Sequence, residues 1–206
     1  HKNDLLENFF IRLLRGSGLK GLTSFGNTKS KIKFDNKIDI FRPLINISQN
    51  ELKYVSKNTF NFSVDDPSNL NDKFLRIRIR KLISKLEEDG LNFNKFKKSL
   101  NNLNKSNYSI DHYVKKNIYD NSNYLPLNKT VILKDDFLKQ PDEIVFRSIS
   151  EVLQNFSKKT TSARGVKVIN LINFLRSDNN LEKKTLSGCI FQKIEKSVII
   201  SHENHK

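Results

Sequence analysis

The sequence predicts a mixed α/β fold in two parts, with a boundary near residue 90. Three observations support this. The chain starts with an amphipathic helical segment followed by alternating, strand-like segments, and a second helical segment ends at Gly90. Beyond it, an Asn- and Lys-rich stretch leads into a smaller, mainly helical region with a terminal β-hairpin. Because 206 residues can form one large core or two small ones, we expect residues 1–90 and 91–206 to be separate domains.

The first segment has the pattern of a helix whose charged and apolar residues lie on different faces. Asp4, Glu7 and Arg15 fall on one side, so two carboxylates lie one turn apart. A glycine in Arg15-Gly16-Ser17-Gly18 can take the left-handed conformation that ends a helix and lets backbone approach a ligand. The segment is therefore either a surface helix with a glycine cap or part of a site. Its apolar stripe consists of Leu5, Leu6, Phe9, Phe10, Leu13 and Leu14.

The next segments predict a hairpin and a capped helix. Residues 31–34 and 37–41 alternate apolar and polar around Asp35-Asn36, as two short strands joined by a turn do. Arg42-Pro43 should end the second strand. Ser48 and Glu51 have the spacing of a capping box, in which each side chain accepts a hydrogen bond from the other residue's backbone N–H. A helix should therefore begin there.

A turn and a one-sided helix complete the first domain. Residues 65–69, Asp-Asp-Pro-Ser-Asn, form a turn cluster that cannot continue a helix. After this turn, apolar residues recur at the spacing of one buried helical stripe, and Gly90 should close the segment. The stripe consists of Leu75, Ile79, Leu82, Ile83 and Leu86.

The second domain has weaker signals. Residues 92–123 are rich in Asn and Lys, although their spaced apolar residues allow a helix. Residues 136–156 and 164–176 are predicted to be helical. Residues 185–201 should form the terminal hairpin, with strands at 188–191 and 198–200.

The charge of the chain indicates a polyanionic partner. The formal net charge is +15 and the pI is about 9.8, and a field of this sign attracts phosphates, so nucleic acid is the expected partner. An alternative is that part of the charge is a passive result of an AT-rich genome, because Lys, Asn, Ile and Phe are all abundant.

Cysteine usage and hydropathy indicate the compartment. A single cysteine, Cys189, excludes an internal disulfide and fits the reducing cytoplasm. No apolar run approaches the roughly 20 residues of a membrane span. We also expect no protein metal site, because His202 and His205 lie in the terminal tail and His112 has no partner in the sequence. The sequence thus predicts a cytoplasmic protein without membrane contact.

Three arginines alternate in the helix after the turn cluster. On a helix Arg76 and Arg80 share a face and Arg78 points elsewhere, so together they could hold phosphate groups from two sides with planar, bidentate contacts. The alternative is a basic face in contact with solvent.

The order of these motifs resembles the tRNA(Ile)-lysidine synthetases. The resemblance covers residues 1 to about 86, and Thr185-Leu-Ser-Gly-Cys189 is similar to a Leu-Gly-Gly-Cys element in the tail of some members. The motifs run His-x-Asn-Asp-x-x-Glu, Arg-Gly-Ser-Gly-Leu-x-Gly-Leu, Arg-Pro-Leu, Asp-Pro-Ser-Asn and Arg-x-Arg-Ile-Arg.

The resemblance implies a Rossmann-like domain of the PP-loop ATPase superfamily and a ligase activity. Such enzymes use ATP, with Mg²⁺ bound through the ATP phosphates, to adenylate the wobble cytidine of a tRNA(Ile) with a CAU anticodon at the C2 oxygen. The side-chain amine of L-lysine then displaces AMP. Residues 91–206 would contact the tRNA.

The resemblance also implies roles for individual residues. Asp4 and Glu7 match acidic positions, where carboxylates would bind and deprotonate the attacking ammonium. The three arginines Arg76, Arg78 and Arg80 match the basic segment and would offset phosphate charge as catalytic groups. Five residues match substrate-binding positions: His1, Arg15, Gly16, Ser17 and Gly18.

Some features depart from the family pattern. Asn3 stands at the first position of a common Asp-Asp pair, Asn8 replaces a threonine, and Ser187 replaces a glycine. The chain has no methionine, so we expect a fragment whose ATP-binding PP-loop lies upstream of His1 and which is inactive alone. Two alternatives stay open, a related tRNA thiolase and a basic RNA-binding module without catalysis. The thiolase is disfavoured because such enzymes generally use cysteines.

Overall fold

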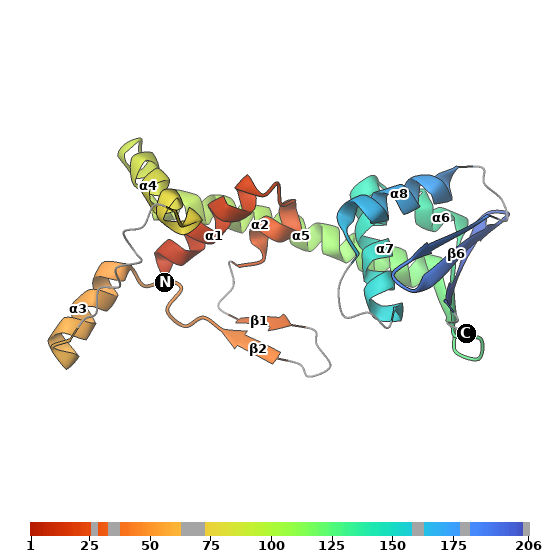
Figure 1. The fold of residues 1–206 in the computed structure, drawn as a ribbon, viewed down its shortest axis with the longest axis horizontal. Coiled ribbons are helices and arrows are strands. Elements are labelled where there is room, and N and C mark those ends of the chain that lie inside the picture. Colours follow the sequence, from red (N-terminus) through yellow and green to blue (C-terminus); the bar gives the residue numbers. More distant parts are fainter. Residues whose placement is uncertain (26–28, 33–37, 63–72, 158–162, 178–181, 204–206) are drawn as a thin grey trace. The chain divides into compact units, whose positions relative to one another are not determined.

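The computed structural model describes residues 1–25, 29–32, 38–62, 73–157, 163–177 and 182–203. The chain forms two compact units, His1–Asn107 (unit 1) and Tyr108–Lys206 (unit 2), each containing helices and strands, which confirms the mixed α/β class (Figure 1). The division falls inside helix α5 (Phe93–Asn121) instead of near residue 90. The physical reason is that Phe96 and Leu100, in the first turns of α5, are buried in the core of unit 1.

Unit 1 begins with helix α1 (Lys2–Leu14), a short helix α2 (Leu19–Thr23) and a β-hairpin. The predicted hairpin is confirmed, because β1 (Lys29–Ile32) pairs antiparallel with β2 (Ile38–Phe41). The first strand starts two residues earlier than expected, and the second ends just before Arg42-Pro43 as predicted. Its turn, residues 33–37, lies outside the described residues.

The predicted capping box begins helix α3 (Gln49–Phe60). The Glu51 backbone N–H donates to Ser48 Oγ at 3.2 Å, and the Ser48 N–H donates to Glu51 Oε2 at 2.6 Å. None of the α3 residues is buried, and Tyr54 and Phe60 are each 71% exposed. The predicted turn at residues 65–69 lies outside the described part of the chain.

The core of unit 1 forms where α1, α4 (Leu75–Glu88) and the start of α5 pack together. Phe9 meets Phe96 edge to face, with ring centroids 5.1 Å apart. Gly90, with φ of 96°, ends the α4 segment as predicted. The buried side chains of this core are Leu5, Leu6, Ile45, Ile79, Ile83, Phe96 and Leu100.

Two predicted stripes are only partly buried. Leu13 and Leu14 at the end of α1 are exposed, and on α4 Ile77 is buried in place of Leu82. The core of unit 1 covers only one side of each helix, and Leu82, next to the buried Ile83, lies off that side.

Unit 2 contains three further helices, α6 (Asp135–Leu138), α7 (Asp142–Phe156) and α8 (Gly165–Arg176). The predicted helix at 164–176 is confirmed. The predicted helix at 136–156 is two helices, because Pro141 precedes α7 and cannot donate the backbone hydrogen bond that a continuous helix needs.

The C-terminal strands form a five-stranded antiparallel sheet in the order β3-β4-β7-β6-β5. The predicted terminal hairpin corresponds to β6 (Cys189–Ile194) and β7 (Ser197–His202). It extends at one side into β5 (Lys183–Leu186) and at the other into β4 (Thr130–Leu133) and β3 (Ser122–Leu125), strands that we did not predict. Four-residue strands at the end of an Asn-rich stretch carry too little alternation to be recognised.

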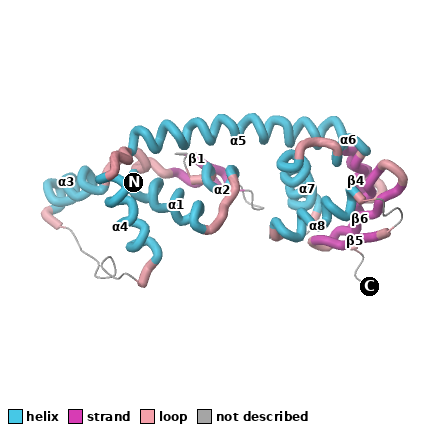
Figure 2. Tube along the Cα trace, turned by 90° about the horizontal axis from the view of Figure 1, so that it is seen from above, coloured by secondary structure: helices cyan, strands magenta, loops and turns pink. Residues whose placement is uncertain are grey.

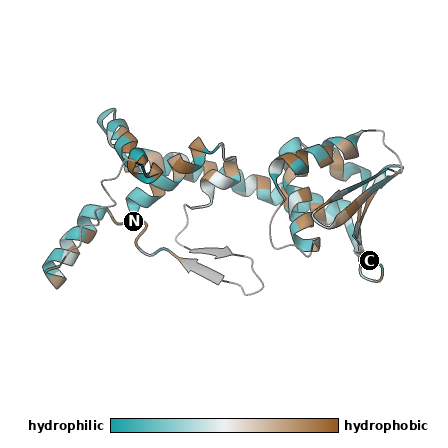
Figure 3. Ribbon diagram, in the orientation of Figure 1, coloured by the Kyte–Doolittle hydropathy of each residue, from teal (hydrophilic) through white to brown (hydrophobic). Residues whose placement is uncertain are grey.

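One face of this sheet forms the core of unit 2. Alternate residues of β4, β6 and β7 are buried, for example Leu133, Phe191 and Ile200. Helices α7 and α8 lie on one side of the strands (Figure 2), and Figure 3 shows hydrophobic residues interspersed with hydrophilic ones along them. Within the residues described, no helix is both long and apolar enough to cross a membrane.

The turn between β5 and β6 lies in the segment Thr185-Leu-Ser-Gly-Cys189, which is similar to the Leu-Gly-Gly-Cys element. Ser187 and Gly188 have φ of 55° and 77°, so both central residues of a two-residue hairpin turn are left-handed. This conformation favours glycine, which accounts for a glycine pair in the similar Leu-Gly-Gly-Cys element. Cys189, the next residue, is fully buried in the core.

Candidate active site

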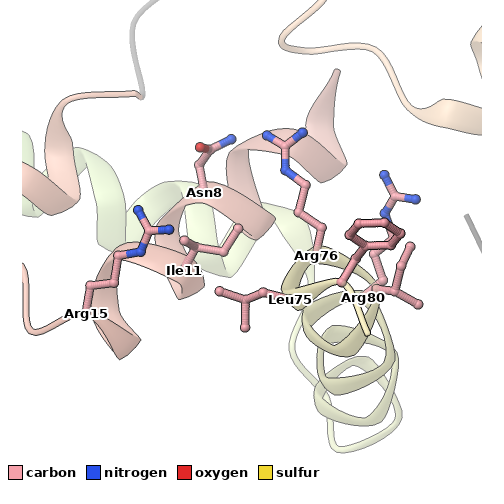
Figure 4. A pocket seen from close by; sticks show the side chains of 8 residues that line it. Asn8, Ile11, Arg15, Leu75, Arg76 and Arg80 are labelled. Atoms are coloured by element: carbon pink, nitrogen blue, oxygen red, sulfur yellow. The ribbon is translucent and has the colours of Figure 1, made fainter. Parts of the chain in front are cut away.

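A pocket of about 530 Å³ lies between α1 and α4, where the two most specific motifs of the sequence meet. Figure 4 shows side chains of both helices around it. Helix α1 contributes Asn8, Ile11 and Arg15, which share a face because they are spaced by three and four residues. Helix α4 contributes Leu75, Arg76 and Arg80.

Beneath the pocket lies a fully buried carboxylate. Glu7 has 0% exposure, and its Oε1 accepts a hydrogen bond of 2.7 Å from Arg80 Nε. Arg76 Nε lies 3.9 Å from the other oxygen, Oε2. A buried carboxylate is tolerated only when it is paired, so this contact joins α1 to α4 across 73 residues of sequence.

This burial corrects the expected position of Glu7. The helical pattern placed it beside Asp4 on the charged side of α1. In the fold Asp4 remains 34% exposed, while α4 covers Glu7 and supplies its cation. Glu7 Oε2 has no hydrogen-bond donor among the described residues, so this oxygen relies on the nearby guanidinium of Arg76.

Asp4 and His1 lie at the start of α1 and do not line the pocket. His1 is the N-cap residue, and its backbone nitrogen is 3.0 Å from Asp4 Oδ2. The Asp4 backbone oxygen accepts a 2.8 Å hydrogen bond from Asn8 Nδ2, which connects the acidic residue to a pocket side chain.

The glycine turn ends α1 as predicted. Gly16 has φ of 68°, and the Ser17 N–H donates to the Arg12 carbonyl at 3.0 Å. Gly21 packs closely on this turn, since a Cβ there would lie 2.8 Å from the Ser17 Cβ. Of the five predicted substrate-binding residues only Arg15 lines the pocket; the others are His1, Gly16, Ser17 and Gly18.

The arginines separate as the helical spacing predicted. Arg76 and Arg80 line the pocket, whereas Arg78 is exposed and its Nη1 donates to the Lys73 carbonyl at 3.3 Å. Sequence reasoning missed the apolar wall formed by Phe74, Leu75, Ile77 and Ile11. For Ile11 a signal existed, because it lies one turn before Arg15.

The pocket suits an anion. Three guanidinium groups line it, and none of its described lining residues is a carboxylate, so a phosphate oxygen would meet bidentate donors. Among the residues described, no group of three His, Cys, Asp or Glu side chains could hold a metal ion.

Comparison with known proteins gives this site a context. Residues 1–87 match the PP-loop domain family. The whole chain is 30% identical over 208 residues to a tRNA(Ile)-lysidine synthase of Wolbachia pipientis, and 98% of it is 32% identical to one of Rickettsia typhi. A third relative, from Orientia tsutsugamushi, is 44% identical over 87 residues, covering 42% of this chain and 18% of its own length.

These findings confirm the resemblance drawn from the motifs. The match to the first two relatives covers 47% and 46% of their lengths, so the chain spans about half the length of the curated relatives it matches.

Proposed function

We propose that this chain, whose residues 1–87 match the PP-loop domain family, acts in an ATP-dependent tRNA(Ile)-lysidine synthase. The reaction would attach the side-chain amine of L-lysine to C2 of the wobble cytidine in a tRNA(Ile) with a CAU anticodon. The observation that carries the proposal is the convergence of Arg15, Arg76 and Arg80 on one pocket between α1 and α4. A ligase that proceeds through an adenylate needs such cations, because charge develops on the phosphate that is transferred.

Within this proposal Arg76 and Arg80 bind phosphate oxygens. Their guanidinium groups are always charged and are forked, so they can offset negative charge without proton transfer. ATP would bring Mg²⁺ on its own phosphates, in keeping with a pocket lined by Arg15, Arg76 and Arg80. Arg78 would act at the edge of the site, where its exposed side chain could meet the RNA backbone.

Glu7 would act as a positioning residue. Its 2.7 Å contact with Arg80 orients the guanidinium toward the pocket, and a fixed cation costs no reorganisation when the phosphate charge develops. This role replaces direct binding of lysine, because the Glu7 carboxylate is buried and already paired.

Asp4 remains the candidate for the lysine amine. It is partly exposed and linked through its backbone to Asn8. A carboxylate there would bind the ammonium group, orient it and accept its proton before the amine attacks C2.

The test uses the protein as its gene encodes it, with a tRNA(Ile) transcript and labelled lysine. Asp4→Asn should stop lysidine formation while pyrophosphate release persists, because adenylation does not need the amine. Glu7→Gln should lower both lysidine formation and pyrophosphate release, since it removes the charge that positions Arg80 and Arg76. Lys85→Ala, which removes an exposed charge from α4, should leave both rates unchanged and serves as the control.

Two results would contradict the proposal. Lysidine formation at the parental rate in both Asp4→Asn and Glu7→Gln would make these carboxylates ordinary structural groups. Tight tRNA binding by the parent without any lysine incorporation would favour the alternative of a basic RNA-binding module.

A further inference from the structure

Unit 2 contains a pocket of its own, formed by α5, α7 and strands of the sheet. It has a volume of about 370 Å³, within the usual range for small-ligand sites. Its base is apolar and consists of Ile118, Val131 and Val152. Val131 and Val152 belong to the core of unit 2, so the base of the pocket is held by the packed sheet and α7.

Three rings form the wall of this pocket. The His202 ring stacks on Phe156, with centroids 4.2 Å apart and planes at 12°. Tyr124, on the edge strand β3, meets Phe156 edge to face at 6.3 Å. Tyr124 is 58% exposed, while Phe156 and His202 are half-buried, so ring surface remains available to a flat ligand.

Polar groups on the rim complement the rings. Lys129 and Asn155 line the pocket and are exposed, and neither side chain makes a hydrogen bond or ion pair with the described residues. An amide presents both donors and an acceptor, which suits the edge of a base, and an ammonium group suits a phosphate. Lys129 has φ of 47° in the turn between β3 and β4, where its backbone N–H donates to the Pro126 carbonyl at 3.3 Å.

We propose that this pocket binds an unpaired nucleobase of RNA, stacked against the Phe156–His202 pair, with Lys129 on the adjoining phosphate. Aromatic platforms beside cations are the common solution for single-stranded nucleic acid, because every base has a face that stacks. Lys129 on the rim, in a unit with 16 Lys and Arg against 11 Asp and Glu, favours this occupant over a neutral flat ligand. A base inside a duplex cannot enter, so the site selects single-stranded or unstacked positions.

The chain contains no tryptophan, which makes a direct test possible. Tyr124→Trp places a single fluorophore at the pocket, and Tyr113→Trp is a matched control, because Tyr113 is also 58% exposed and does not line the pocket. A single-stranded oligoadenylate of eight nucleotides should quench the fluorescence of Tyr124→Trp and leave that of Tyr113→Trp nearly unchanged. Heparin supplies the same kind of charge without bases and should quench neither variant.

Loss-of-ring variants give a second measurement. His202→Ala and Phe156→Leu should each raise the Kd for the oligoadenylate roughly 5- to 150-fold, the range measured for removal of one stacking ring. Tyr113→Ala should change the Kd less than twofold. Circular dichroism of each variant confirms that unit 2 is folded, and Phe156→Leu keeps most of the buried volume.

Three results would overturn the proposal: equal binding of a matched RNA duplex, quenching by heparin equal to that by RNA, or an unchanged Kd in both ring variants. The outcome is separate from the ligase proposal, because lysine incorporation is measured independently and its failure would leave the fluorescence response intact.

Discussion

The two units differ in the number of apolar side chains that form their cores. In the described residues, the core of unit 2 joins fifteen buried apolar side chains from the sheet and its helices, whereas the core of unit 1 joins seven. Unit 1 in turn contains a fully buried carboxylate, Glu7, paired with the arginines of α4. Its helix α3 buries no residue at all.

The net positive charge is also unequal between the two units. Unit 1 contains 21 Lys and Arg against 11 Asp and Glu, and unit 2 contains 16 against 11. The excess of cations therefore lies mostly in the unit with the arginine pocket. Unit 2 also buries a charged side chain, Arg147, which pairs with the more exposed Glu143 and Asp111. The two units therefore differ in the size of their apolar cores, and in the sign of the buried charge, more than in the presence of an ion pair.

The largest expected effect is in the core of unit 2. Phe191 is 0% exposed, so Phe191→Ala should leave a cavity and cost about 3–5 kcal/mol. Hydrogen exchange read by mass spectrometry should show loss of protection in β4, β6 and β7 with α1 and α4 unchanged. Equal loss in α1 would mean that the two units unfold together and that the comparison fails. Ile194→Ala, on the same strand but 37% exposed, should have a smaller effect.

The next effect concerns the buried pair of unit 1. Arg80→Ala leaves the Glu7 carboxylate buried without its closest cation, which should cost about 3 kcal/mol. Breaking a buried pair usually costs about 3–5 kcal/mol. We expect the lower end because the Arg80 side chain is 36% exposed, so water can partly replace its guanidinium as a partner of Glu7. Urea unfolding followed by the protection of α1 and α4 measures the change. Lys85→Ala should stay within about 0.5 kcal/mol, and a similar loss in both variants would exclude a special role for the pair.

A smaller and opposite effect is expected at the β5–β6 turn. Ser187 has φ of 55°, where a side chain is strained, so Ser187→Gly should stabilise unit 2 by about 0.5–1 kcal/mol. The melting temperature of unit 2 should rise. No change, or a fall, would mean that the Ser187 side chain makes a compensating interaction.

The smallest effect is a pH dependence of helix α3. The hydrogen bonds of Ser48 hold the pKa of Glu51 below its ordinary value of 4.5, with Lys2 adding to the shift. Since the pKa is lowered on folding, the stabilisation is present above the ordinary value and is lost as pH falls through the lowered folded value. Helix α3 should therefore fray only below about pH 4.5 as Glu51 protonates.

Carbon-detected NMR of the Glu51 carboxyl measures this titration. Ser48→Ala should return the pKa of Glu51 toward its ordinary value. Asp135 in unit 2 is the internal reference, because its pKa is lowered by Lys139 and should not respond to Ser48→Ala. A parallel change at Asp135 would show that the variant acts on the whole chain.

Local signals in the sequence determined much of the secondary structure. The capping box at Ser48 and Glu51, the end of α1 at Gly16 and the hairpin before Arg42-Pro43 were all predicted, because each depends on hydrogen bonds between residues close in sequence. The arginine periodicity likewise predicted that Arg76 and Arg80 share a face. The motif order was enough to identify the family that residues 1–87 match.

Only the tertiary structure decided which of these residues are buried and which elements meet. Glu7 is buried because α4 packs over it, a contact between residues 73 positions apart that no helical period contains. Strand β4 pairs with β7, and β3 pairs with β4 in turn. Unit 1 extends past residue 90 because the first turns of α5 complete its core. Local propensity fixes the conformation of a short segment, whereas burial and strand pairing depend on partners that only the folded chain brings together.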